Sequence, residues 1–373
     1  MIDFYDIHVL VFIAFAISFV IQMIYIWLIF ARLAFYKSDA DKKVEKPVSV
    51  VITSHDEFYH LKKFLPAILT QDYPDYEVVV VNDHSDDESD DLLDRMSEQY
   101  PHLKVVNMSH SVSFYPGKKF PLSIGIKSAK NDILLLTDAD CQVNSKNWIR
   151  KMQQGFDDQT QIVLGYGPYQ PQKGLLNYLI RYYSFFTAFQ YLSFALAKTP
   201  YMGVGRNLAY RKSLFYKNNG FISHYKVASG DDDLFINETA TKKNVKICVD
   251  PDSFTYSVPK TTFGQWIKQK KRHLSAGRLY KKKHQYLLSL YPFSLLVFYA
   301  LFSFQMVTGY LFYYVLGILF VRLVSFLIVQ KASMNKLQEK KLFLTSPLLE
   351  LFIFLLNSFL VVSNTMSSKN KWK

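Results

Sequence analysis

The chain has little cysteine and glycine, and it contains no internal repeat or low-complexity linker. Its 373 residues include 14 glycines and two cysteines, Cys141 and Cys248. The two cysteines have none of the short spacings of a metal site, and we expect them in a reducing compartment, where disulfides rarely persist. A disulfide scaffold, a cysteine-based metal site and a repeat architecture are therefore excluded, and we interpret both cysteines as small core residues.

Charge is absent from one long segment near the N-terminus. Residues 9–30 carry no charged side chain, and about 22 apolar residues in a helix can cross a hydrocarbon core of roughly 30 Å. A cleaved signal peptide would be shorter and would follow basic residues, whereas Asp3 and Asp6 precede this segment. We therefore predict an uncleaved transmembrane helix in residues 1–36.

Two later segments are also almost wholly apolar. Residues 286–330 are too long for one span and are interrupted by Gln305, Thr308 and Gly309, which predicts two transmembrane helices with a tight connection. Residues 344–363 form a shorter run, which we interpret as a fourth transmembrane helix or a re-entrant one. The 50% hydrophobic and 16% aromatic composition agrees with a chain that lies partly in the lipid bilayer.

Positive charge predominates, and the formal net charge is +13. Lysines follow the first predicted span (Lys37, Lys42, Lys43, Lys46) and the third (Lys331, Lys336, Lys340, Lys341), and a basic run precedes the second. This distribution is typical of cytoplasmic segments and requires no nucleic-acid partner. The Lys-rich composition favours a bacterial inner (cytoplasmic) membrane, with the middle of the chain in the cytoplasm. Lys369, Lys371 and Lys373 would then fall on the opposite side, which leaves a re-entrant or interfacial placement of residues 344–363 open.

Residues 45–260 alternate strand-like and helix-like segments. Runs such as residues 78–81, four valines, show no polar alternation, as in strands that are buried on both faces of a parallel sheet. The alternation predicts an α/β domain with a Rossmann-like, mostly parallel sheet. Ligands of such sheets bind beyond the carboxyl ends of the strands.

Two carboxylates end one of these strands. Asp138 and Asp140 follow the apolar residues 133–136 and are separated by Ala139, so in extended backbone they project from the same face. Carboxylate oxygens are ligands that Mg²⁺ and Mn²⁺ prefer, and both cations bind diphosphates. The pair predicts a divalent-cation site for a nucleotide sugar, although a solvated Asp-x-Asp loop is the commoner origin of such a pattern.

Further polar groups follow the other predicted strands. Ser54 and Glu57 lie in a loop that suits a ribose or base, and Asp83 ends the second strand; a helix cap is the alternative at both places. Lys118 precedes a helix and suits a diphosphate, with a plain surface lysine as the alternative.

Three acids in a row, Asp231, Asp232 and Asp233, precede an apolar helix. Adjacent carboxylates repel one another, so at least one pKa is expected to rise toward the range of a general base. The alternative is a helix start whose acids are favoured by the helix dipole.

Residues 261–285 are predicted to form an amphipathic interfacial segment. Gln269 and Arg272 are three residues apart and share a helical face, with His273 beside them. The planar guanidinium of arginine suits a leaving diphosphate. A basic interfacial helix would explain the lysines here but not the glutamine.

Taken in order, these motifs resemble those of the membrane-bound family 2 glycosyltransferases, the group of cellulose, hyaluronan and poly-N-acetylglucosamine synthases and ceramide glucosyltransferase. The resemblance covers approximately residues 47–283. It implies a GT-A fold, a nucleoside-diphosphate sugar donor (UDP- or GDP-sugar), a divalent cation (Mg²⁺ or Mn²⁺) and inversion at the anomeric carbon.

The resemblance also implies a role for each matching residue. Ser54, Glu57, Asp83, Lys118 and Asp138 would bind the donor, Asp140 and Asp138 the metal, and Gln269, Arg272 and His273 the diphosphate and the acceptor. Asp232 would be the catalytic base, with Asp231 as the alternative register. His273 stands where the family usually has tryptophan, which puts processive polymerisation in doubt.

Three functions stay open at this point. The first is an inverting transferase for a membrane-associated glycan or lipid in cell-envelope polysaccharide or glycolipid synthesis. The second is a single-addition lipid glycosyltransferase, because three or four spans are few for a secretion channel without a second copy or an export partner. The third is a catalytically silent membrane subunit or scaffold. Arg322 and Glu350, which lie in the predicted spans, are expected to pair because unpaired charges are costly there.

Overall fold

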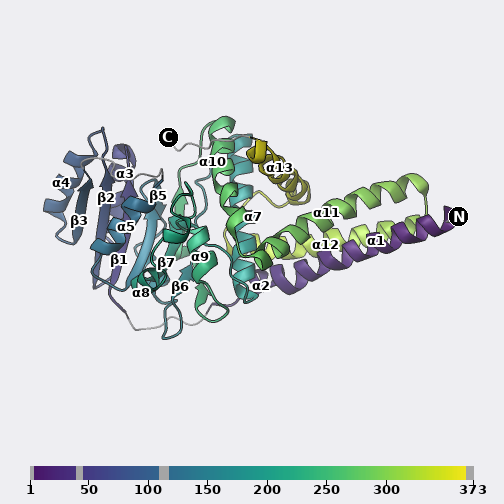
Figure 1. The fold of residues 1–373 in the computed structure, drawn as a ribbon, viewed down its shortest axis with the longest axis horizontal. Helices are drawn as coiled ribbons and strands as arrows, with labels where there is room; N and C mark the ends of the chain where they lie inside the picture. Colours follow the sequence, from purple (N-terminus) through teal and green to yellow (C-terminus); the bar gives the residue numbers. More distant parts are fainter. Residues whose placement is uncertain (1–3, 39–44, 109–116, 367–373) are drawn as a thin grey trace.

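The computed structural model describes residues 4–38, 45–108 and 117–366. It consists of an α/β domain and a bundle of long helices that extends away from it (Figure 1). The bundle contains α1 (Phe4–Ile24), α11 (Lys282–Thr308) and α12 (Phe312–Lys336). Between the bundle and the sheet lie α7 (Leu175–Leu196), α10 (Phe263–Ala276) and α13 (Ser346–Met366), which form a connecting layer.

The domain is built on a seven-stranded sheet with the order β3-β2-β1-β4-β7-β6-β8. The strands are β1 (Val48–Ser54), β2 (Tyr76–Asp83), β3 (Leu103–Met108), β4 (Ile133–Asp138), β6 (Ile162–Leu164), β7 (Leu208–Arg211) and β8 (Val245–Ile247). β1 pairs in parallel with β2 and β4, β2 with β3, and β6 with β8. Only β7, among the described strands of this sheet, runs antiparallel to its neighbours. The predicted mostly parallel α/β sheet is therefore confirmed.

Helices cover both faces of the sheet, which explains why the strands are apolar without alternation. Val50 on β1 packs with α3 (Phe58–Leu69), α4 (Ser89–Gln99) and α6 (Trp148–Gln153), whereas Val51 packs with α5 (Lys119–Ser128). A Cβ on Gly125 of α5 would lie 2.7 Å from Cγ1 of Val51, so glycine at this position lets the helix lie close to the sheet. Two short helices, α8 (Lys212–Lys217) and α9 (Asp233–Thr239), and a two-stranded sheet of β5 (Cys141–Val143) and β9 (Thr255–Ser257) complete the domain.

Four helical segments among the described residues are long and apolar enough to cross a membrane: residues 7–34, 282–308, 312–336 and 346–364. The first runs through α1, a π-helical segment (Tyr25–Phe30) and α2 (Ala31–Ala34). Gly309 caps α11 with a φ of +70°, a conformation that glycine adopts without strain. The chain therefore turns sharply between α11 and α12, at the predicted polar interruption.

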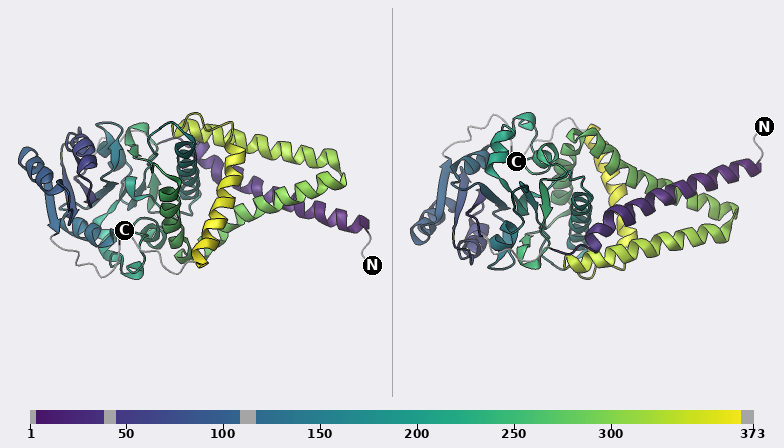
Figure 2. Two further views of the ribbon diagram at one scale, coloured as in Figure 1. Left: turned by 90° about the horizontal axis from the view of Figure 1, so that it is seen from above. Right: turned by 90° about the horizontal axis from the view of Figure 1, so that it is seen from below.

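α13 runs across the base of the other three apolar helices (Figure 2). Near its start, the hydroxyl of Tyr182 on α7 donates to the carbonyl of Ser346 at 2.9 Å. Near its end, Nζ of Lys271 on α10 donates to Oγ of Ser363 at 2.6 Å, and Nδ2 of Asn364 donates to the carbonyl of Lys271 at 2.8 Å. Both ends of α13 are thus bonded to helices of the connecting layer.

The predicted pairing of Arg322 and Glu350 is confirmed. The guanidinium of Arg322 on α12 lies 2.6 Å from the carboxylate of Glu350 on α13, and both side chains are 0% exposed. Gln22 of α1 accepts a hydrogen bond from the same guanidinium, and the hydroxyl of Tyr291 on α11 donates to Glu350. One buried polar cluster therefore joins α13 to all three helices of the bundle.

Candidate active site

A cleft of about 810 Å³ opens where β1, β2 and β4 end, and it reaches the connecting layer. Every side chain that the sequence assigned to a donor, metal, catalytic or acceptor role lines it. They are Ser54, Glu57, Asp83, Lys118, Asp138, Asp140, Asp231, Asp232, Gln269, Arg272 and His273. Six separate stretches of the chain are thus brought to one cavity, and this convergence makes the cleft the candidate active site.

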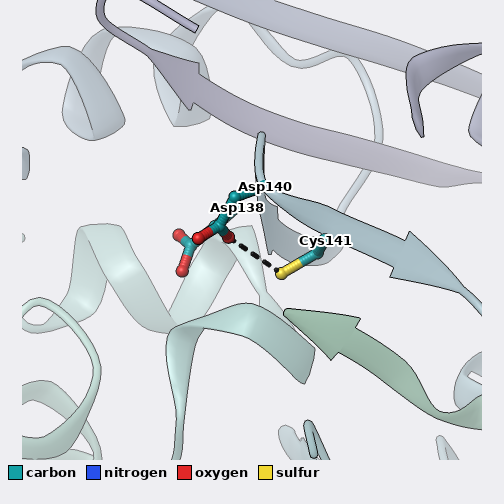
Figure 3. Close-up of side chains that lie close together, drawn as sticks. All are labelled: Asp138, Asp140 and Cys141. Carbon is teal, nitrogen blue, oxygen red and sulfur yellow. Dashed lines mark hydrogen bonds between the residues drawn. The ribbon is translucent and has the colours of Figure 1, made fainter. Parts of the chain in front are cut away.

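Asp138 and Asp140 lie side by side at the end of β4 (Figure 3). Nζ of Lys118 lies 2.9 Å from Oδ1 of Asp138. Burial alone would raise the pKa of Asp138, but this ammonium lowers it. For Asp140, burial together with the charges of Asp138 and Glu57 raises the pKa to about 6. The two carboxylates therefore repel each other, and a cation between them would relieve that repulsion.

Cys141 is close to this pair but is a poor third ligand. Its thiol donates to Asp140 and forms a hydrogen bond with the hydroxyl of Ser257. Burial raises its pKa well above the usual range, so the side chain stays a thiol, whereas the metal-binding form of cysteine is the thiolate. Two carboxylate oxygens without a thiolate fit a hard cation such as Mg²⁺ or Mn²⁺.

The three consecutive acids have three different environments. Asp231 is buried and lies 3.1 Å from Nζ of Lys118. Asp233 is also buried and accepts a hydrogen bond of 2.8 Å from the hydroxyl of Tyr280. Asp232, between them, is half-buried in the cleft and accepts from the backbone N–H of Gly205 at 2.7 Å. Asp232 is therefore the acid of the three with the greatest access to a substrate.

Burial and mutual repulsion raise two of these pKa values, as the sequence predicted. Burial and the Asp231 carboxylate raise the pKa of Asp232. Burial and the Asp232 carboxylate raise that of Asp233 to about 8. A raised pKa makes Asp232 a stronger base than an ordinary surface aspartate.

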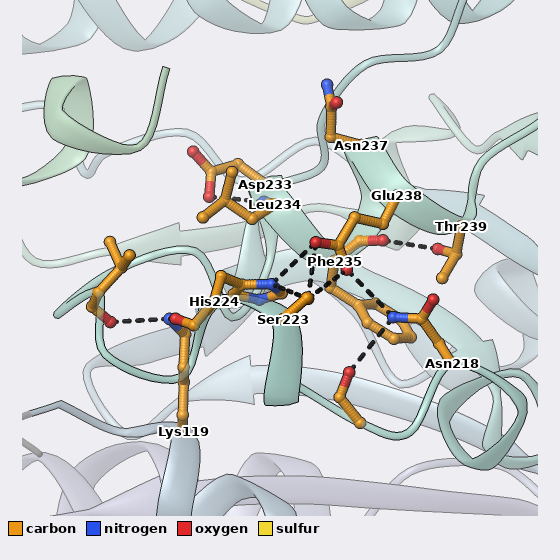
Figure 4. Close-up of polar contacts among 12 residues, drawn as sticks. Lys119, Asn218, Ser223, His224, Asp233, Leu234, Phe235, Asn237, Glu238 and Thr239 are labelled. Carbon is orange, nitrogen blue, oxygen red and sulfur yellow. Dashed lines mark hydrogen bonds and ion pairs between the residues drawn. The ribbon is translucent and has the colours of Figure 1, made fainter. Parts of the chain in front are cut away.

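The loop before these acids is held in place by the buried side chain of Lys119 and by a polar cluster next to it (Figure 4). Nζ of Lys119 donates to the carbonyls of His224, Val227 and Ser229, each at 2.7 Å. His224 also lies 3.2 Å from the carboxylate of Glu238. Lys118 and Lys119 thus have separate tasks, because the first faces the acids in the cleft and the second positions the loop.

The sequence did not single out Arg206, which lines the same cleft. Its guanidinium lies over the ring of Tyr169, 4.6 Å from the centroid, and donates to the carbonyl of Gly167 at 3.0 Å and to Oγ of Ser184 at 3.2 Å. Residues 202–207 contain Gly203 and Gly205, which allow a ligand to approach the backbone closely. The position of an arginine directly after such a glycine was the signal in the sequence that could have identified Arg206 as a residue of the site.

Residues 49–218 match the family model described as Glycosyl transferase family 2. This part of the chain is a family 2 glycosyltransferase domain. It includes the ends of β1, β2 and β4 with Asp83, Asp138 and Asp140, while the three acids and α10 lie beyond the match. The glycosyltransferase domain has the GT-A fold that the sequence predicted.

The proteins similar to this chain include two relatives and one solved structure. The probable glycosyltransferase YdaM of Bacillus subtilis (strain 168) is 25% identical over 235 residues, which are 60% of this chain and 54% of that protein. A beta-monoglucosyldiacylglycerol synthase of Synechocystis sp. is 28% identical over 148 residues, which are 39% of this chain and 29% of that protein. The matches thus span about half of the first relative and less than a third of the second.

The solved structure is the mannosyltransferase PcManGT from Pyrobaculum calidifontis, in complex with GDP-Man and Mn²⁺. It has a TM-score of 0.58 and 18% sequence identity, and the alignment covers 90% of this chain and 99% of that one. At this identity the similarity establishes the fold of the glycosyltransferase domain.

Proposed function

We propose that the protein is an inverting glycosyltransferase that moves a sugar from a nucleoside-diphosphate sugar to an acceptor held at the membrane. The observation that carries this proposal is the cleft itself, which gathers acids for a cation, acids for a donor, a candidate base and the Gln269/Arg272 pair in one cavity. The match of residues 49–218 to the family 2 glycosyltransferases supports sugar transfer as the reaction. The relative named as a diacylglycerol glycolipid synthase and the bound GDP-Man and Mn²⁺ of the solved structure support a sugar-nucleotide donor and a lipid acceptor.

The proposed reaction is a single displacement at the anomeric carbon. An acceptor oxygen forms the new C–O bond and loses its proton to the carboxylate of Asp232. On the other side of the carbon, the bond to the diphosphate breaks, and Arg272 stabilises the charge that develops on the leaving group. Asp138 and Asp140 would hold the cation, which when bound neutralises diphosphate charge. Ser54, Glu57 and Asp83 would bind the nucleoside end.

Among the three functions that the sequence leaves open, the structure favours single addition to a lipid over export of a polymer. The cleft meets the connecting layer, so an acceptor anchored in the membrane would reach it over a short path. The silent-subunit alternative is disfavoured, because each acid that the reaction needs is present and lines the cleft.

The test is transfer of a labelled sugar by purified full-length protein in vesicles. UDP- and GDP-sugars would be supplied one at a time with Mg²⁺ or Mn²⁺, and label would be counted in the lipid extract and in the water-soluble fraction. We expect label in the lipid extract from one donor class. Label confined to a long water-soluble polymer would instead favour a polysaccharide synthase.

The placement of α13 leads to a prediction about topology. Because both ends of α13 are bonded to α7 and α10, we propose that it lies in the membrane interface and that only three helices cross. Its exposed side chains Leu348, Phe352, Leu355, Phe359 and Val362 recur every three or four residues, which places them on one face that can contact lipid. The C-terminal end of α13 would then lie on the same side as the catalytic domain, which the positive-inside rule places in the cytoplasm.

Reporter fusions test this topology. Green fluorescent protein, which folds in the cytoplasm, and alkaline phosphatase, which is active outside it, would each be fused to the C-terminal end. We expect fluorescence and no phosphatase activity. A second insertion at Gly309, in the α11–α12 turn, is the control and should give the opposite result. Phosphatase activity at the C-terminal end would show that α13 crosses the bilayer.

A further inference from the structure

The cleft has a wall to which the proposed chemistry assigns no role. This wall is formed by α7, whose side chains Tyr183, Ser184, Thr187 and Tyr191 line the cavity. The same helix packs against the membrane-side elements: Phe186 stacks edge-on with Phe354 of α13, and Phe189 contacts Phe30 at the end of the first apolar segment. The α7 wall is therefore the boundary between the cleft and the apolar helices.

Lys270 of α10 faces this wall and is 6% exposed. Its Nζ lies 4.2 Å from the centre of the Tyr183 ring. Within residues 4–38, 45–108 and 117–366, no carboxylate oxygen lies within 4.0 Å of this Nζ, the limit for an ion pair. Burial and the charge of Arg206 lower its pKa to about 7. A buried ammonium without a counter-ion is costly, and an anion in the cleft would remove that cost.

Arg206 adds a second positive charge to the same wall. Its guanidinium bonds to Ser184 of α7, to Gly167 and to the hydroxyl of Tyr169, all of them neutral acceptors. Within the described part of the chain, Arg206, like Lys270, forms no ion pair with a carboxylate. Backbone N–H of Gly205, the preceding residue, binds Asp232. Arg206 thus directly follows the residue that binds the candidate base.

The source of the anion follows from where these cations lie. The donor diphosphate is expected beside Asp138, Asp140 and Arg272, where a cation would also bind. The charge of Arg206 also helps to lower the pKa of Asp138. Its guanidinium, however, donates to Ser184 of α7, and Lys270 lies over the Tyr183 ring of the same helix, on the boundary with the membrane-side helices. An anion that reached the two cations along α7, from the membrane side, would be part of a lipid rather than of the donor.

We propose that Lys270 and Arg206 form an anion-binding subsite on the α7 wall that takes the phosphate of a membrane lipid acceptor. The inference rests on the proposed function and narrows its acceptor to phosphate-bearing lipids. The subsite would hold the phosphate on the membrane side of the cleft and direct a hydroxyl of the lipid headgroup toward Asp232. A terminal phosphate would instead supply an ionised oxygen for the attack, which has no proton for Asp232 to remove. Arginine binds phosphate through paired donors, and the lysine adds a point charge.

The experiment compares acceptors that differ in the phosphate. Full-length protein in phosphatidylcholine vesicles would receive the donor identified above and one of three lipids: dioleoylglycerol, dioleoyl-phosphatidylglycerol or undecaprenyl phosphate. We expect transfer to a phosphate-bearing lipid and little to dioleoylglycerol. The two anionic lipids distinguish a phosphodiester headgroup from a terminal phosphate. Preferred transfer to dioleoylglycerol would overturn the proposal while leaving the glycosyltransferase function intact.

The variant Lys270→Gln tests the residue itself. Loss of a charge-assisted contact should raise the KM for the anionic lipid by roughly 10- to 100-fold, with the affinity for the nucleoside diphosphate unchanged. Lys282→Gln, which removes an exposed lysine that does not line the cleft, is the charge-matched control and should leave both quantities unchanged. Weaker nucleotide binding in Lys270→Gln would assign the lysine to the donor diphosphate and overturn the proposal. Wild-type protein that neither binds a donor nor transfers its sugar would instead contradict the proposed function.

Discussion

Asp232→Asn is expected to lower kcat by a factor of roughly 10³ and to leave donor affinity unchanged, because the amide cannot take a proton from the acceptor. The substitution preserves shape, and the amide oxygen can still accept from the backbone N–H of Gly205, which lies 2.7 Å from the carboxylate. Single-turnover transfer and equilibrium binding of the nucleoside diphosphate measure the two quantities separately.

Asp233→Asn is the matched control for this prediction. Burial raises the pKa of Asp233 to about 8, so at neutral pH the side chain is mostly the uncharged acid, which asparagine mimics. We expect transfer close to that of the wild type. If Asp231→Asn abolished transfer while Asp232→Asn retained it, the base would be Asp231, the alternative register that the sequence left open.

Arg322→Met should destabilise the protein by about 3–5 kcal/mol, because it leaves the carboxylate of Glu350 buried without its partner. Both side chains are 0% exposed, and their atoms are 2.6 Å apart. The midpoint of thermal unfolding in detergent should fall by on the order of 5–10 °C. Because Glu350 belongs to α13, we also expect α13 to become accessible to proteolysis before the catalytic domain does.

The double variant Arg322→Met/Glu350→Leu is the control for this effect. Removing both charges leaves no unpaired ion, so most of the lost stability should return. A double variant as unstable as the sum of the two single variants would show that the residues act independently, and the pair would then not be the element that fixes α13 to the bundle.

The sequence predicted the parallel sheet and the position of the cleft because both depend on local patterns. Uninterrupted apolar runs mark strands that are buried on both faces, and Asp83 and Asp138 stand directly after two of them. The pairing of Arg322 and Glu350 was also predictable, since two opposite charges in apolar segments have few other partners.

Other features depend on contacts between distant segments and left no local pattern. Arg206 lies beside Tyr169 and Ser184 only because β7 runs antiparallel next to β4, an arrangement that the alternation of strands and helices does not indicate. Lys270 looked like one more lysine of a basic helix until the ring of Tyr183 placed it inside the cleft. Hydropathy alone could not distinguish a crossing helix from an interfacial one, and our proposal for α13 rests on its hydrogen bonds to α7 and α10.

The most direct test of the central claim is release of nucleoside diphosphate by the purified protein from a panel of UDP- and GDP-sugars, with and without Mg²⁺ or Mn²⁺ and in the presence of a lipid extract. We predict release from one donor class that requires the metal and is lost in Asp140→Ala, because this carboxylate is one of the two at the proposed cation site. Release that persists without metal and in Asp140→Ala would contradict the assigned cation site. Absence of both donor binding and release would contradict the assignment of the cleft as a nucleotide-sugar site.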